Sequence, residues 1–352
     1  MGDKLTFTVF ADLHYKKGMY VSSVDDVLEI FDEAEKKGSS LVVHLGDMCN
    51  DYLRSVEITN AYLNNSKGLD VCGVYGNHEL ETVGNDMALV TPLLTNKTDD
   101  AVWGSDDGKI GDGSIAYYYY DKGSFRFVCT DTNYSLDPVS GNYVHNLPAS
   151  WGPPDENTLV NSLGPKQLKW LESVLTDAAE KEKTCIILSH AAFYTEWDRA
   201  ADADKVRAIF DKMNSIRKNT VVLSLNGHYH NNRSAVLNDV TYLDINTVHS
   251  GWWEGKCFYP YAEKDMNAPI YTYRYTEYDQ GGNPAESFNR PLSSLTMGAQ
   301  TLFLKDPLFT TVTVGSDGTV EMLGKETEWM YGITPKDHTV ADNLRRISEF
   351  KK

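Results

Sequence analysis

Five short, mostly apolar runs recur along the first two thirds of the chain. Runs of this length that are rich in Val, Ile, Leu and Phe are typical of buried β-strands. Each run is followed within a few residues by a side chain that can bind a metal ion. The runs and the residues that follow them are Leu5–Phe10 and Asp12, Leu41–Leu45 and Asp47, Val71–Tyr75 and Asn77, Cys185–Leu188 and His190, and Val221–Leu225 and His228.

Segments with helical spacing separate these runs. Apolar residues between Val24 and Ala34 recur at helical intervals, and Lys36-Lys37-Gly38 is typical of a helix end. The alternation of strands and helices at the start of the chain favours a parallel central sheet. We therefore expect an α/β fold of two packed sheets flanked by helices. Further helices are predicted near Asp51–Asn64, Pro165–Ala179 and Asp202–Ile216.

The polar residues that follow the runs are expected to meet at one edge of the sheet. In α/β sheets, ligands bind outside the carboxyl ends of the strands. Oxygen and imidazole ligands suit Mn, Fe or Zn, and a single tetrahedral ion takes fewer ligands than this chain offers. The sequence therefore predicts a site for two metal ions with the ligands Asp12, His14, Asp47, Asn77, His190, His228 and His230.

The charge of such a site indicates what it would bind. Two divalent ions and a bridging hydroxide carry more positive charge than Asp12 and Asp47 carry negative charge, so the cluster would attract a phosphate ester. A metal pair about 3.5–4 Å apart can hold the attacking and leaving oxygens of an in-line displacement at phosphorus. We therefore expect a phosphoric ester hydrolase in which the metal-bridging hydroxide attacks phosphorus.

The order of these motifs resembles that of the calcineurin-like metallophosphoesterase superfamily. Asp-x-His alone is common, whereas Gly-His-x-His is expected by chance on the order of 0.02 times in a chain of this composition. The resemblance implies an α-β-β-α sandwich with two mixed sheets. The matching segments are Asp12-Leu13-His14, Gly46-Asp47, Gly76-Asn77-His78-Glu79, Ser189-His190 and Gly227-His228-Tyr229-His230, with further similarity at Gly164–Leu171, Phe309–Val314 and Thr319–Leu323.

The same resemblance implies a role for each residue of the motifs. His78 would be the catalytic imidazole beside the leaving group, and Asp47 would bridge the two metal ions. The first ion would be held by Asp12, His14, Asp47 and His230, and the second by Asp47, Asn77, His190 and His228.

Two positions differ from other branches of this superfamily. Relatives with a purple-acid type of site carry Gly where this chain has His14 and Tyr where it has Asn50, so we expect no Tyr–Fe(III) pair. Other branches carry at the second position an Asp that pairs with the catalytic His. Because this chain has Asn50 there and Asp51 beside it, the group that orients His78 stays open.

Other histidines and several cations have simpler interpretations. His44 lies inside an apolar run, so we expect it in the core. Surface or loop positions are expected for His145, His249 and His338, and a position near the site is the alternative for His249. Solvated positions are expected for four cations, with a phosphate contact as the alternative: Lys16, Lys17, Arg199 and Arg233.

Composition restricts the classes of partner. The chain of 352 residues has a net charge of −17, which opposes binding to duplex nucleic acid or to an anionic membrane. A small phosphate ester remains compatible, because bound metal ions set the local field. No apolar stretch approaches the roughly 20 residues that a membrane span needs. The sequence leaves the oligomeric state unknown.

The cysteines and the N-terminal sequence bear on the compartment. Four of the five cysteines lie in or beside strand-like runs, which favours buried free thiols in a reducing compartment. The N-terminal residues lack a basic segment followed by an apolar one. We therefore expect a cytoplasmic protein, with a secreted protein whose signal peptide was removed as the alternative.

Two long segments are expected to wall the open side of the metal site within a single domain spanning residues 1–352. Residues 133–163 are polar and rich in Pro and Gly, and residues 250–308 form an aromatic-rich insert. Burial against the sheet is the default for these aromatics, and a substrate wall is the alternative. They are Trp252, Trp253, Phe258, Tyr259, Tyr261, Tyr271, Tyr273, Tyr275 and Tyr278.

A cationic cluster beside rigid apolar faces suits a small organic phosphate, either a monoester or a nucleotide-type diester. Two other functions stay open. One is a phosphoprotein phosphatase, and the other is a non-catalytic metal-binding module of the same fold that binds a partner.

Overall fold

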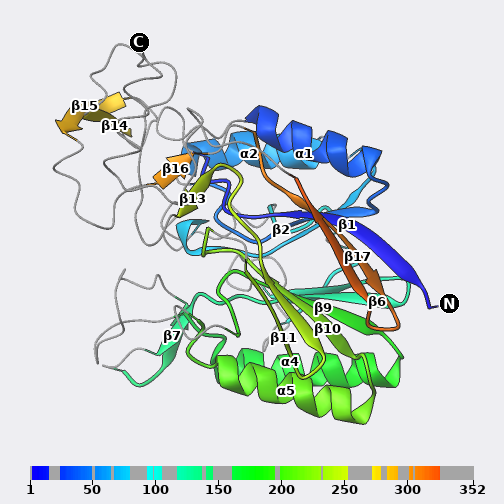
Figure 1. Ribbon diagram of the computed structural model, residues 1–352. Helices are drawn as coiled ribbons and strands as arrows, with labels where there is room; N and C mark the ends of the chain where they lie inside the picture. The colour runs from blue at the N-terminus through cyan, green and yellow to red at the C-terminus, as the bar shows by residue number, and fades with distance from the viewer. Residues whose placement is uncertain are drawn as a thin grey trace.

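Two β-sheets lie face to face between two layers of helices in the computed structural model (Figure 1). This arrangement confirms the expected α/β fold of two mixed sheets flanked by helices. Among the helices of the described ranges, none combines the length and apolar character that a membrane span requires. The structure describes residues 2–15, 24–49, 52–64, 67–79, 93–97, 99–104, 117–136, 140–145, 161–194, 199–230, 233–252, 272–278, 284–291, 301–303 and 306–325.

The first sheet has five strands in the order β18-β17-β1-β2-β3. The three parallel strands β1 (Lys4–Phe10), β2 (Leu41–His44) and β3 (Asp70–Gly73) correspond to the first three predicted runs. The C-terminal strands β17 (Thr310–Gly315) and β18 (Val320–Gly324) add to it in antiparallel register, with Phe7 opposite Val312. The C-terminal strands β17 and β18 therefore lie beside β1, the first strand of the chain.

The second sheet has seven strands in the order β11-β12-β10-β9-β6-β5-β4. Its centre is parallel and consists of β6 (Phe125–Cys129), β9 (Thr184–Ser189), β10 (Val221–Asn226) and β12 (Val240–Asp244). The antiparallel edge strands are β4 (Val102–Trp103), β5 (Tyr118–Lys122) and β11 (Arg233–Leu237). Burial on both faces explains why most residues of the central strands are apolar.

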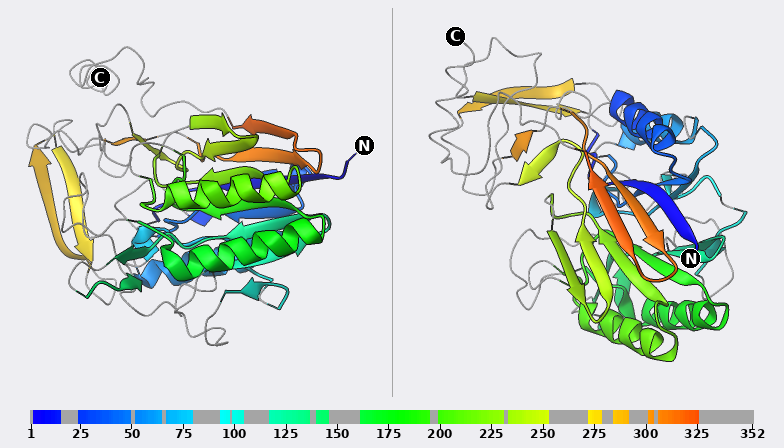
Figure 2. Two further views of the ribbon diagram at one scale, coloured as in Figure 1. Left: turned by 90° about the horizontal axis from the view of Figure 1, so that it is seen from below. Right: turned by 45° about the vertical axis from the view of Figure 1, so that its right-hand side comes forward.

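Four helices cover the outer faces. Figure 1 shows α1 (Val24–Lys36) and α2 (Tyr52–Asn64) outside the first sheet, and α4 (Gly164–Glu180) and α5 (Ala203–Ile216) outside the second. Seen from below, α4 and α5 run alongside the strands that they cover (Figure 2). These bounds agree with the predicted helices to within a few residues.

Helix α1 shows how the sequence sets the ends of these helices. Its buried residues Val27, Ile30, Phe31 and Ala34 form one stripe, because three or four positions make about one helical turn. The helix ends at Gly38, which has a φ of +69° and donates its N–H to Glu35 O at 3.0 Å. Glycine adopts this left-handed conformation without a steric penalty, so it closes the helix.

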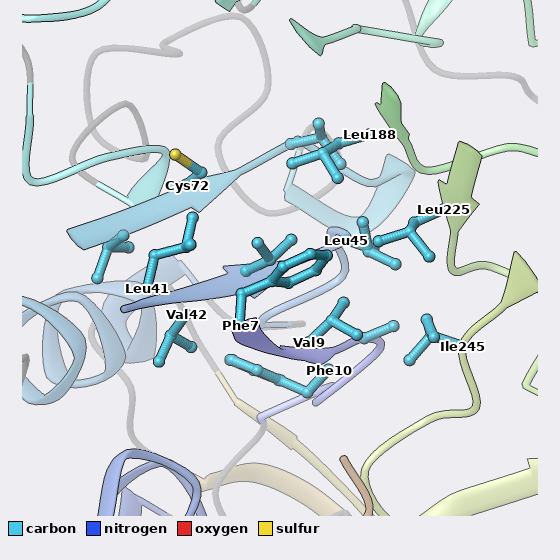
Figure 3. Packing of buried hydrophobic residues seen from close by; sticks show 14 of the residues in the cluster. Phe7, Val9, Phe10, Leu41, Val42, Leu45, Cys72, Leu188, Leu225 and Ile245 are labelled. Atoms are coloured by element: carbon cyan, nitrogen blue, oxygen red, sulfur yellow. The ribbon is translucent and has the colours of Figure 1, made fainter. Parts of the chain in front are cut away.

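Apolar side chains fill the space between the two sheets. Figure 3 shows Phe7 of β1 and Leu45, directly after β2, together with Leu188 and Leu225 of the second sheet. The rings of Phe7 and Phe127 meet edge to face across the interface, with centroids 5.4 Å apart. Burying a side chain of this size stabilises the fold by roughly 1.5–3 kcal/mol. The packing fixes how the sheets face each other, and therefore which strand ends meet.

The two long segments contain strands that the sequence did not predict. A hairpin of β7 (Tyr134–Leu136) and β8 (Tyr143–His145) lies within the segment 133–163 that was expected to be irregular. Within residues 250–308, β13 (Ser250–Trp252) pairs with β16 (Thr301–Phe303), and β14 (Thr272–Tyr278) pairs with β15 (Pro284–Pro291). The side chains of the proposed aromatic wall lie outside the described residues, so this expectation stays untested.

Candidate metal centre

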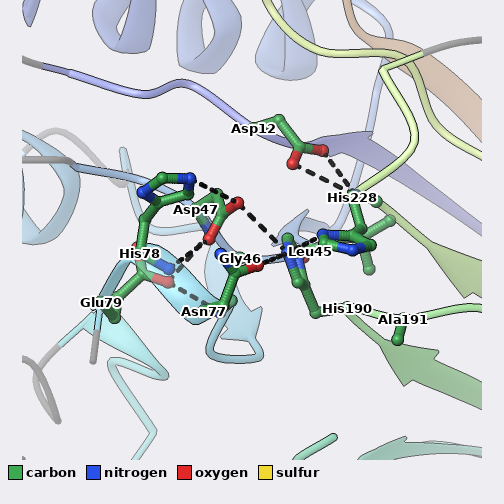
Figure 4. Close-up of polar contacts among 12 residues, drawn as sticks. Asp12, Leu45, Gly46, Asp47, Asn77, His78, Glu79, His190, Ala191 and His228 are labelled. Atoms are coloured by element: carbon green, nitrogen blue, oxygen red, sulfur yellow. Dashed lines mark hydrogen bonds and ion pairs between the residues drawn. The ribbon is translucent and has the colours of Figure 1, made fainter. Parts of the chain in front are cut away.

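The predicted ligands meet where strands of both sheets end. Asp12 and Asp47 follow β1 and β2, whereas His190 and His228 follow β9 and β10 of the other sheet (Figure 4). The two loops of the first sheet are joined by backbone hydrogen bonds, because Asp12 donates its N–H to Gly46 O at 3.1 Å and His14 donates to Asp47 O at 2.8 Å. All seven predicted ligands lie in this one cluster.

One part of the cluster contains Asp12, His14 and His230. The Nε2 atoms of His14 and His230 are 2.9 Å apart, and His230 Nε2 lies 3.4 Å from Asp12 Oδ1. Ligands that share one metal ion at about 2.0–2.2 Å lie at such separations from one another. These three side chains can therefore hold a common ion.

A second part contains Asp47, Asn77, His190 and His228. The Nε2 atom of His190 lies 3.2 Å from Asp47 Oδ2, 3.2 Å from Asn77 Oδ1 and 3.1 Å from His228 Nδ1. Asp47 also faces the first part, since its Oδ2 is 3.8 Å from His14 Nε2. This position between the two groups is the one that a bridging ligand needs.

The backbone is strained at five of the ligands. Asp12, His14, Asp47, His228 and His230 all have a φ between +49° and +70°. They make up half of the ten non-glycine residues with positive φ in the described ranges, and the remaining five lie elsewhere in the chain. Such a conformation disfavours an L-residue by roughly 1–2 kcal/mol, and Asp and His tolerate it better than most. The fold therefore holds these ligands in place against a local conformational penalty.

Two glycines allow the ligand loops to approach closely. Gly46 has a φ of +93°, and a Cβ at this position would lie 2.7 Å from His190 Nδ1. A Cβ on Gly76 would collide with the carboxylate and backbone nitrogen of Asp47. The glycines of the Gly-Asp and Gly-Asn-His-Glu motifs are thus required by the packing of one loop on the other.

The electrostatics of the cluster fit a pair of cations. The side chains of Asp12 and Asp47 are 0% and 2% exposed, yet within the described part of the chain neither pairs with a lysine or an arginine. Two buried carboxylates without a cation are strongly unfavourable. Imidazole nitrogens surround both of them, and this mixed oxygen and nitrogen set suits Mn, Fe or Zn.

The histidines differ in their protonation. Burial, together with His230 and His78, lowers the pKa of His14 to about 3, so this imidazole is neutral and can donate a lone pair to a metal ion. Burial opposes protonation of His190 too, but the charge of Asp47 outweighs this and raises its pKa to about 10. A positive charge beside Asp47 is therefore favoured, and a metal ion would displace that proton.

A backbone carbonyl sets the orientation of His190. Its Nδ1 lies 2.7 Å from Leu45 O and can only donate there, which leaves Nε2 to face Asp47 and Asn77. Hydrogen bonds of this kind fix the tautomer of metal-binding histidines.

Glu79 has a structural role that the sequence did not reveal. Its buried carboxylate accepts the backbone N–H of Gly76 at 2.7 Å, of Asp47 at 2.9 Å and of Met48 at 2.5 Å. Burial and the nearby charge of Asp47 raise its pKa to about 7. The only signal in the sequence was its place at the end of the Gly-Asn-His-Glu motif.

His78 lies beside the cluster. Its backbone N–H donates to Asp47 Oδ1 at 2.8 Å, and its Nε2 is 4.0 Å from Asp47 Oδ2. Its ring meets that of His14 edge-on, with centroids 4.8 Å apart, and its side chain is more exposed than those of Asp47 and His190. Asn50 and Asp51, between which the orientation of His78 was left open, lie outside the described residues.

Neither of two other histidines lies on the surface, although His249 is in a loop as expected, between β12 and β13. His249 is buried and faces Asp26, with Nε2 and Oδ1 3.1 Å apart, because residues 247 and 248 bond to the backbone of Asp12 and Ala11. His145 is shielded because its Nε2 lies 2.7 Å from the buried Asp131. His44 is buried as expected, and its Nε2 donates to Leu93 O.

Of the four cations that were weighed as phosphate contacts, only Arg199 has its side chain in the described part of the chain. Arg199 forms two hydrogen bonds with Asp204, at 2.9 and 3.1 Å. Lys16, Lys17 and His338 and the side chain of Arg233 lie outside the described residues.

Comparison with known proteins gives consistent matches. A manganese-dependent ADP-ribose/CDP-alcohol diphosphatase from Xenopus laevis is 26% identical over 186 residues, which are 46% of this chain and 51% of that protein. The chain thus aligns with about half the length of this curated relative. A crystal structure of a dimetal phosphatase from Danio rerio superposes with a TM-score of 0.52 at 18% identity, covering 91% of this chain and 98% of the other.

The structural likeness at this low identity concerns the fold, and it agrees with the two-sheet sandwich described above. The family is assigned by a match between the sequence and a model that describes one whole protein family. The model described as calcineurin-like phosphoesterase matches residues 5–232, which contain all seven predicted ligands and His78. The chain therefore belongs to the calcineurin-like phosphoesterase family.

Proposed function

We propose that this protein is a two-metal hydrolase of small organic phosphates, and that its substrates are of the nucleotide type with a diphosphate linkage. The observation that supports the reaction is the pair of buried carboxylates, Asp12 and Asp47, faced by histidines and by no described lysine or arginine. The substrate class is suggested by the relative named as an ADP-ribose/CDP-alcohol diphosphatase.

The proposed ligands divide between two ions. Asp12, His14, Asp47 and His230 would hold one ion, and Asp47, Asn77, His190 and His228 the other. Bound Mn, Fe or Zn would supply a hydroxide nucleophile near neutral pH and would offset negative charge on the phosphate. Asn77 contributes a neutral oxygen, which leaves the positive charge of the site undiminished.

His78 is proposed to act on the leaving group. Its backbone is anchored on Asp47 at 2.8 Å, and its imidazole lies beside the cluster at the more exposed side. From there it can donate a proton to the leaving oxygen, which would otherwise depart as an unstable anion. Although the geometry would also allow His78 to bind a metal ion with His14 and Asp47, the seven other side chains would already give each ion four protein ligands.

A matrix of metals and substrates tests the proposal. The purified protein would be loaded with Mn, Zn or Fe and assayed with ADP-ribose, an aryl monoester, an aryl diester, cyclic nucleotides and a phosphopeptide. We expect turnover of the diphosphate to exceed turnover of the phosphopeptide. Asp47→Asn is expected to abolish activity and lower the metal content, because it removes the charge shared by both ions.

Asp70→Asn is the matched control. Asp70 is also a buried carboxylate, but it lies at the start of β3, whereas the loop with Asn77 follows the end of this strand. It pairs with Lys97, Lys122 and Tyr120. It is expected to keep both metal content and activity. Wild-type protein without bound metal after loading would refute the proposal. A preference for the phosphopeptide would indicate a phosphoprotein phosphatase, and full metal loading without any turnover would indicate a non-catalytic binding module.

A further inference from the structure

A second carboxylate–histidine pair lies next to the metal cluster. Asp131 follows β6 and is fully buried, and its Oδ2 lies 2.7 Å from His145 Nε2 at the end of β8. Its Oδ1 accepts the backbone and side-chain N–H groups of Asn133, both at 2.9 Å. These three hydrogen bonds favour the ionised carboxylate, which in turn favours a protonated imidazole.

The imidazole has a second N–H to offer. His145 Nε2 is engaged by Asp131, and Tyr134 lies against the ring with centroids 4.8 Å apart. Within the described residues no acceptor bonds to the Nδ1 atom, and the side chain is 17% exposed. The contact with Asp131 raises the pKa of His145 although burial opposes this. Asp131 therefore holds this imidazole at a fixed position, with Nδ1 bonded to no acceptor among the described residues.

The pair is tied to the loops that carry two proposed metal ligands. The Asn133 side chain donates to Gly76 O at 3.4 Å, directly before Asn77. The hydroxyl of Thr132 accepts the N–H of Ala191 at 3.2 Å, directly after His190. Both Asn77 and His190 belong to the second proposed metal group, so the segment that follows Asp131 packs against the loops of that group. Figure 1 places β7, the partner of β8, at the end of the sandwich opposite the N-terminus, where β1 also ends.

We propose that His145, held by Asp131, is a substrate-binding residue that contacts the phosphate next to the scissile one. This inference rests on the proposed function and deepens it, because it explains how the site would distinguish a diphosphate from a monoester. The metal ions would bind the scissile phosphate, and a second phosphate needs its own counter-charge. A fixed N–H on a cation forms short, charge-assisted hydrogen bonds with phosphate oxygens. The chain as a whole has a net charge of −17. The attraction for a second phosphate therefore has to come from a cation that the fold holds at the site.

Binding of two nucleotides that differ by one phosphate tests this directly. ADP and AMP would be titrated into metal-loaded protein by calorimetry, and ADP-ribose and an aryl monoester would be compared in steady-state assays. Wild-type protein is expected to bind ADP more tightly than AMP. His145→Gln keeps a group that can bond to Asp131 but removes the charge, and it is expected to weaken ADP binding about 10- to 100-fold with little effect on AMP. In turnover it is expected to raise KM for ADP-ribose far more than it lowers kcat.

Two variants distinguish a substrate contact from a purely structural role of His145. His145→Arg retains the cation and is expected to restore most of the preference for ADP. Leu136→Gln alters a residue of the same hairpin that is 50% exposed. It is expected to leave the affinities for ADP and AMP unchanged. Metal content and the melting temperature are measured for all variants.

The outcomes are distinct for the two proposals. Equal loss of ADP and AMP binding in His145→Gln, or no preference for ADP in wild-type protein, would overturn the role of His145. A preference for ADP that His145→Gln abolishes, in a protein that hydrolyses none of the esters, would support His145 as a phosphate contact and refute the hydrolase.

Discussion

Glu79 Oε2 accepts the backbone N–H of Asp47 at 2.9 Å, so a residue of one ligand loop holds the central ligand of the next. The same oxygen accepts the N–H of Gly76, and the other oxygen accepts that of Met48. All these donors are backbone groups, and they converge on one buried carboxylate. Glu79 is therefore a positioning residue for the two loops that carry Asp47 and Asn77.

We predict that Glu79→Gln lowers metal affinity about 10- to 100-fold, as removal of supporting hydrogen bonds around metal ligands commonly does. Glutamine replaces one acceptor oxygen with an NH₂ group, which would face backbone donors and push the loops apart. Metal titration followed by elemental analysis measures the change. Metal affinity equal to that of wild type would show that the loops keep their geometry without Glu79.

We predict that His78→Ala lowers kcat by roughly 10²–10⁴ and leaves both metal ions bound. The reason is the proposed proton transfer to the leaving oxygen, which matters in the transition state more than in substrate binding. The effect is expected to shrink for an aryl ester whose leaving group departs readily as an anion. Loss of one metal ion in the variant would instead identify His78 as a ligand.

Gly46→Ala is predicted to destabilise the fold and disrupt the metal site, and Gly38→Ala is its matched control. Both glycines have positive φ, but only at Gly46 would a Cβ meet His190, whereas nothing lies within 4 Å of the Cβ position at Gly38. The control is expected to lower the free energy of unfolding by about 1 kcal/mol and to keep metal affinity. Denaturant titration and metal analysis distinguish the two. Equal effects in both variants would mean that backbone strain alone is responsible.

The pair of Asp131 and His145 predicts a pH window of stability. Burial opposes both charged forms, but mutual contact lowers the pKa of Asp131 and raises that of His145. The contribution of Asp131 is present above its unfolded pKa of about 3.9 and is lost as pH falls through its folded value. The contribution of His145 is present below its unfolded pKa of about 6.5 and is lost as pH rises through its folded value.

The difference in melting temperature between wild type and His145→Gln is therefore expected to be largest between about pH 4 and pH 6.5. It is expected to shrink at lower and at higher pH. Melting curves recorded across this range test the prediction, and a difference that does not change with pH would show that the pair carries no charge.

The side chains of the cluster could be selected from the sequence because five of the seven closely follow an apolar run. The runs before Asp12 and Asp47 are long enough to identify strands, and parallel strands bring their ends together. The backbone geometry could not be predicted from the sequence, because the φ of +53° at Asp12 depends on a hydrogen bond to the loop after β2. The same holds for Glu79, whose partners are backbone groups that carry no signal in the sequence.

The hairpin of β7 and β8 was missed for a different reason. Its strands have three residues each, too few to show a period of two against the polar surroundings. The contact between Asp131 and His145 depends on this hairpin, so neither residue could be recognised from spacing. Sequence patterns thus identify residues on long regular elements and miss those brought together by short ones.

The origin of the ligands in both sheets has a consequence for the whole fold. Asp12 and Asp47 extend from one sheet, and His190 and His228 from the other, so bound ions would cross-link the two halves of the sandwich. Binding to the folded state alone would add stability that grows with free metal, by about 2.7 kcal/mol at a hundredfold excess over Kd. A shortage of metal would then reduce the amount of folded protein as well as its rate of turnover.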